Sequence, residues 1–100
     1  MDDKRKPDEQ IGRAAHASAL LSDPLLKESM EAAETSLILQ WRTGKTTLAR
    51  EEAFFKLEGL KRVLVELRAI VSDGAFAQKL LDADAQRAQR EQSIVGKHRE

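Results

Sequence analysis

The sequence predicts an all-α protein: an antiparallel helical hairpin with a short N-terminal helix and a C-terminal helix, in an oligomer. Ala, Leu, Glu, Lys, Arg and Gln dominate the composition, and proline occurs only at Pro7 and Pro24, which is typical of helical chains. Apolar residues recur at three- and four-residue spacings in two long segments that are separated by a glycine. One hundred residues make one domain with a modest core, so a partner subunit would help to stabilise it.

Composition excludes several classes of protein. The 17 basic and 17 acidic residues balance, which argues against a chain that coats nucleic acid through overall charge. Cysteine is absent, so disulfides and thiolate sites are excluded. No secretion signal is visible and no apolar run approaches the roughly 18 residues needed to span a bilayer. We therefore expect a soluble chain without a membrane partner.

Three parts follow along the chain. Residues 1–10 are charged and contain Pro7, which favours a flexible arm. Residues 11–92 are expected to form one helical domain, and residues 93–100 a flexible tail. Within the domain, "QIGRAAHASALL" at 10–21 predicts a short helix before the hairpin.

The hairpin is predicted over residues 24–72. Asp23 is suited to cap its first helix, which begins at Pro24 and runs to about Arg42. Thr43-Gly44 is the predicted stop, with the glycine in the left-handed conformation. The apolar stripe of this helix contains Leu26, Met30, Ala33, Leu37 and Trp41.

The second hairpin helix is predicted to begin at Thr46 or Thr47 and to end at Ser72-Asp73-Gly74, with a further helix over 75–92. Gly59 interrupts it, either to admit a neighbouring helix or as a merely tolerated residue. Glu58 and Arg62 are spaced for an ion pair on the solvated face. The apolar seam contains Ala53, Leu57, Leu60, Leu64, Leu67 and Val71.

The stretch "GKTT" at 44–47 is similar to the end of a nucleotide-binding phosphate loop. That loop needs a glycine five residues before Gly44, where this chain has Leu39, and it needs a preceding strand. Neither His16 nor His98 has a second metal ligand at suitable spacing. We therefore predict no catalytic, cofactor-binding or metal-binding residues.

Two sets of residues near the bend are candidates for contacts. Arg42, Lys45 and Arg50 cluster there, either as a surface for DNA phosphates or as a solvated loop. The predicted protein interface combines aromatic residues beside the bend with leucines of the seam, because a small core leaves such residues in need of a partner. Its members are Trp41, Phe54, Phe55, Leu57, Leu60 and Leu64.

The segment from residue 17 to 81 resembles a family of small helical proteins encoded in the head and DNA-packaging modules of tailed phages and prophages. The resemblance rests on Ala17 to Pro24, Trp41-Arg42, Arg50-Glu51, Phe54-Phe55, and Gly74 followed by Phe76-Ala77. More distantly, the hairpin is similar to the oligomerisation core of small terminase subunits, which form rings, recognise viral DNA and regulate the large packaging ATPase. The chain departs from them in lacking a clear N-terminal helix-turn-helix.

The resemblance implies a non-enzymatic phage or gene-transfer-particle protein that forms a homo-oligomer and acts in genome packaging. Its expected partners are the large terminase or another head protein and double-stranded DNA, in the bacterial cytoplasm or in the virion. Two alternatives remain open at this point: a head-associated structural or assembly protein, and a small DNA-binding regulator.

Overall fold

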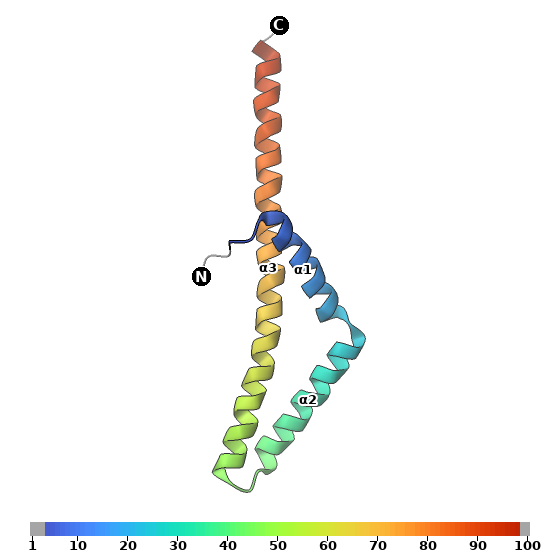
Figure 1. Ribbon diagram of the computed structural model, residues 1–100, viewed down its shortest axis with the longest axis vertical. Helices are drawn as coiled ribbons and strands as arrows, with labels where there is room; N and C mark the ends of the chain where they lie inside the picture. The colour runs from blue at the N-terminus through green and yellow to red at the C-terminus, as the bar shows by residue number, and fades with distance from the viewer. Residues whose placement is uncertain (1–3, 99–100) are drawn as a thin grey trace.

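A computed structural model describes the backbone of residues 4–98 and the side chains as far as Ser93. This part of the chain contains three helices and no strand: α1 (Pro7–Ser22), α2 (Pro24–Thr43) and α3 (Thr47–His98) (Figure 1). The all-α prediction is therefore confirmed. It also follows that the residues before Gly44 are helical, whereas a phosphate loop requires a strand there.

The first helix is longer than the sequence predicts. α1 begins at Pro7, inside the segment expected to be an arm. Pro7 takes the first helical turn, where its missing N–H costs nothing, and Asp8 and Glu9 lie near the positive end of the helix. Residues 1–3 of the predicted arm lie outside the described residues.

Asp23 forms the junction between α1 and α2. Its extended backbone ends α1, and its carboxylate Oδ1 accepts a hydrogen bond of 2.9 Å from the backbone N–H of Leu26. This is the predicted cap, and it satisfies one of the amide groups left free at a helix start. The two helices meet with only one residue between them.

Residues 44–46 make the bend between α2 and α3. Thr46 caps α3, because its Oγ1 accepts a 3.0 Å hydrogen bond from the N–H of Ala49. The left-handed conformation predicted for Gly44 is wrong, since its φ is −58°. Close approach explains the glycine instead: a Cβ there would lie 2.7 Å from Cγ of Arg50 and 3.0 Å from the carbonyl oxygen of Gln40.

The predicted break at residues 72–74 is also wrong, because α3 is one helix of 52 residues. Gly74 is buried inside it, against α1. A Cβ on Gly74 would collide with Cβ of Ala14 and would lie 3.0 Å from the carbonyl oxygen of Gln10. The glycine therefore marks a close helix crossing and not a helix end, at a cost in helix propensity of about 1 kcal/mol.

The molecule is elongated, with extents of 83 × 29 × 17 Å and a Cα radius of gyration of 22.4 Å. A compact domain of this length has a radius of gyration of about 13 Å. α1 and α2 lie along one side of α3, and the last turns of α3 extend beyond α1 (Figure 1). Among the described residues the apolar core is small and consists of Ala17, Ala53, Leu57 and Ala77.

Candidate functional site

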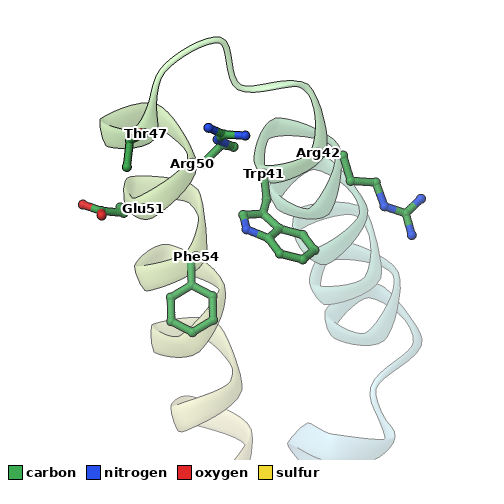
Figure 2. Close-up of a pocket in the computed structure, with 6 residues that line it drawn as sticks. All are labelled: Trp41, Arg42, Thr47, Arg50, Glu51 and Phe54. Carbon is green, nitrogen blue, oxygen red and sulfur yellow. The ribbon is translucent and has the colours of Figure 1, made fainter.

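The hairpin tip carries a groove of about 500 Å³ between the end of α2 and the start of α3. Figure 2 shows its lining residues, two from α2 and four from α3. They are Trp41, Arg42, Thr47, Arg50, Glu51 and Phe54. The bend positions this groove, since the Thr46 cap and the contact of Gly44 with Arg50 fix how α3 leaves the turn.

Its aromatic residues remain accessible. Trp41 is 48% exposed and Phe54 is 44% exposed, and the indole lies between the two helices (Figure 2). The ring of Phe55 meets that of Phe54 edge to face, with centroids 5.7 Å apart. Trp41 and Phe54 thus share one groove, as expected for a pair that closes the hairpin, but neither is buried. The groove offers apolar surface to a partner.

The basic residues at the tip do not converge on one point. Arg50 lies beneath the bend between the helices, whereas Arg42 points away from α3 (Figure 2). Lys45 is an exposed residue of the bend itself. The N-terminus of α3 adds partial positive charge close to these side chains. Separated cations of this kind suit successive phosphates along a nucleic-acid backbone better than a single phosphate group.

The seam leucines of the predicted interface pack within the chain. Leu57 is buried, and Leu60 and Leu64 are half-buried on the side of α3 that faces the other helices. Phe55 instead points to solvent. Of the predicted interface residues, the aromatic ones are therefore the accessible set.

A second groove, of about 290 Å³, was not foreseen from the sequence. It opens where α1 meets α2, opposite the middle of α3, because the two helices together are longer than the part of α3 that they span. At 1.5 Å per residue α1 and α2 run about 54 Å, against about 45 Å of α3 between the bend and Ala77, so their junction stands away from α3. The lining residues are Leu21, Leu26, Lys27, Met30, Glu31, Glu34, Leu64 and Arg68.

Within the described residues, no three His, Asp or Glu side chains are grouped so as to hold a metal ion. No helix in that same part of the chain combines the length and apolar character needed to cross a membrane. Comparisons with protein-family models, curated proteins and solved structures found no match to the chain. The assignment of a function therefore depends on the surface of the molecule and on the resemblance of its sequence pattern.

Proposed function

We propose that the protein is a non-enzymatic adaptor in viral DNA packaging, similar to a small terminase subunit, which acts as a homo-oligomer and binds DNA or the large packaging ATPase. The observation that carries the proposal is the hairpin tip, where accessible aromatic and basic side chains lie together at one end of an elongated molecule. Its expected location is the cytoplasm of a bacterial host, with possible partners among the other head proteins.

Electrostatics supports a contact with double-stranded DNA at this end. Each cationic side chain that neutralises a phosphate releases a counterion, and the resulting gain in DNA affinity is largest at low salt. Arg42, Lys45 and Arg50 are all exposed, so each is available for such a contact. Trp41 and Phe54 between them supply the apolar area that a protein partner would use.

The test is DNA binding by a variant in which Arg42, Lys45 and Arg50 are all replaced by alanine. The logarithm of the binding constant is measured against the logarithm of salt concentration, and we expect the slope to fall by about 2 to 3 with the loss of three phosphate contacts. The matched control replaces Lys27, Arg68 and Arg90, which removes the same charge elsewhere. Equal losses from both variants would show that the tip is not the DNA site.

A structural role in the phage head is the second candidate, and the shape of α3 favours it. The helix continues past α1 (Figure 1). Most side chains of this part are exposed as far as Ser93, as suits an assembly or scaffold component. Presence of the protein in purified particles would support this role. Co-purification with the large packaging ATPase, together with absence from particles, would support the adaptor. A DNA-binding regulator would instead bind DNA without either association.

A further inference from the structure

The long helix α3 has two faces that remain opposite each other along its length. The inward face carries the seam that packs against α1 and α2. On the outward face, Leu48 is 66% exposed, Phe55 is 68% exposed and Phe76 is 64% exposed. Both the seam and the outward residues follow a seven-residue period, so neither drifts around the helix relative to the other. The outward face therefore has large apolar side chains and no partner within the described chain.

The accessible surface is larger than a compact protein of this mass exposes. It measures 8368 Å², against about 5,700 Å² for a compact monomer of 11.2 kDa. A typical stable protein interface covers about 800 Å² on each partner. The excess, roughly 2,700 Å² on the same scaling, is more than enough for one such interface.

Charges on the outward face decide how two copies of α3 can pair. The face consists of two lines of residues at heptad spacing. One line holds Leu48, Phe55, Arg62, Ala69, Phe76 and Ala83, and the other holds Glu52, Gly59, Glu66, Asp73, Leu80 and Arg87. A parallel, in-register pair would place like charges against each other at 52, 62, 66, 73 and 87, which is unfavourable at every one of these layers.

We propose that two copies of the chain associate back to back through the outward faces of α3, in an antiparallel register with the two-fold axis between residues 67 and 68. In this register, facing residues have numbers that add up to 135. Phe55 faces the partner's Leu80, and Arg62 faces the partner's Asp73. Each pairing occurs twice by symmetry, and the overlap from 48 to 87 is about 60 Å long.

Gly59 gives independent support for this register. A Cβ built on it meets nothing within 4 Å, so packing inside the described chain does not explain a glycine in the middle of the helix. In the proposed dimer the partner's Phe76 lies over Gly59, where the missing side chain leaves room for the ring. A shift of seven residues in either direction would place Phe76 opposite the partner's Glu66 or Glu52.

Residues at the edges of the pairing are also complementary. Glu58 lies beside the partner's Lys79, and neither makes an ion pair with another described residue of its own chain. The ion pair predicted between Glu58 and Arg62 is wrong, because Arg62 pairs with Glu66 at 2.7 Å instead. Val63 lies beside the partner's Ile70, whose side chain is half-buried next to α1, so this edge adds a smaller apolar contact. Opposite charges at such flanking positions are known to set helix orientation.

This dimer deepens the homo-oligomer that forms part of the proposed function, and it leaves both hairpin tips accessible at the two ends of the α3 pair. Its test needs neither DNA nor the packaging ATPase. Failure of DNA binding would therefore remove the DNA contact proposed for the tip without affecting the dimer, and failure of the dimer test would leave DNA binding at the tip unaffected.

The absence of cysteine makes thiol cross-linking a clean test in the full-length chain. Glu58→Cys and Lys79→Cys variants are mixed and treated with a short thiol-specific cross-linker. We expect a heterodimer from the mixture and little product from either variant alone, because equivalent residues are about 30 Å apart in the antiparallel pair. Ser36→Cys on α2 mixed with Lys79→Cys is the control and should give little product. Cross-linking of each variant alone, or none in the mixture, would overturn the proposal.

Exchange of the central charges gives a second measurement. Arg62→Asp and Asp73→Arg each place like charges in two layers, and we expect each to weaken dimerisation at least about tenfold. The double variant restores opposite charges and should return to within about threefold of the original dissociation constant. Circular dichroism checks that every variant remains helical. Single variants without effect, or a double variant as weak as the singles, would contradict the register.

Discussion

The two regions in which α3 packs against other helices differ in how the contact is made. Near Gly74, α1 approaches closely through small residues, and Ala17 and Ala77 are almost completely buried there. Near the bend, α2 approaches with larger residues, yet Trp41 and Phe54 are about half exposed. Apart from Leu57, the buried side chains of the described chain are therefore alanines, whereas the large aromatic ones remain accessible.

The difference teaches that residue size alone does not identify the core. Two helices can approach most closely where the side chains between them are smallest, and dispersion and burial then come from the many contacts of the backbone and Cβ atoms. The large apolar residues at the tip and on the outward face of α3 are available to partners. Variants near Gly74 and near the bend test this contrast.

Truncation of Leu57 should have the largest effect on stability. Leu57 is the largest buried residue in the described chain, at 9% exposure, and Leu57→Ala should lower the free energy of unfolding by about 2 to 4 kcal/mol. Leu39→Ala is the matched control, since Leu39 is exposed on α2, and it should cost less than about 0.5 kcal/mol. Urea denaturation at a fixed protein concentration measures both. Similar losses would mean that α2 does not pack on α3 through Leu57.

The same substitution should have opposite effects at two glycines. Gly74→Ala forces α1 away from α3, because the new Cβ collides with Ala14, and we expect a loss of about 1 to 3 kcal/mol. At Gly12 a Cβ meets nothing within 4 Å, so Gly12→Ala should stabilise the helix by up to about 1 kcal/mol. Thermal unfolding of the two variants decides this, and a stabilising Gly74→Ala would refute the close crossing.

Removal of the helix caps should have an intermediate effect. Asp23→Ala and Thr46→Ala each remove a side-chain acceptor from a backbone N–H and should each cost about 1 kcal/mol. Thr35→Ala, at an exposed position inside α2, controls for the change in side chain. Hydrogen exchange of the amides of Leu26 and Ala49 should accelerate only in the matching cap variant. Unchanged exchange in both would argue against these caps.

The smallest effect is expected beyond the crossing, where α3 has no neighbour within the described chain and Asp84 lies only at the edge of the proposed dimer contact. Asp84 and Arg87 form an exposed pair at 3.9 Å, and Asp84→Asn should change the free energy of unfolding by less than about 0.3 kcal/mol. High salt should abolish that change, because exposed pairs are screened. A loss of more than about 1 kcal/mol would mean that the Asp84 side chain is buried and not at the exposed edge of α3.

Local signals in the sequence predicted where α2 and α3 begin. Asp23 stands directly before Pro24, and Thr46 is the last residue of the bend, so each cap can be recognised from the residues next to it. The same local patterns gave wrong predictions at Gly74 and Gly44, because both glycines are explained by close contacts. Gly74 lies against α1, which is distant in the chain, and Gly44 lies against residues on either side of the bend. The close approach of α1 to Gly74 involves residues about 60 positions earlier in the chain, which a local pattern does not reveal.

At the candidate site, the sequence correctly grouped Trp41 and Phe54 at the tip, since both flank one short bend. It did not separate the seam leucines, which pack within the chain, from Phe55 on the outward face. That distinction needs the direction from which α1 and α2 approach α3. To predict the groove at Leu26 and Leu64, one must also know the relative lengths of the three helices.

The molar mass in solution tests the central claim most directly, which is that this elongated chain is a subunit of a larger assembly. Light scattering on the purified protein at micromolar concentration should give about twice the chain mass of 11.2 kDa, or a higher even multiple if dimers assemble further. Phe55→Glu should shift the population toward the single chain. A monomer of 11.2 kDa across the whole micromolar range would contradict the account.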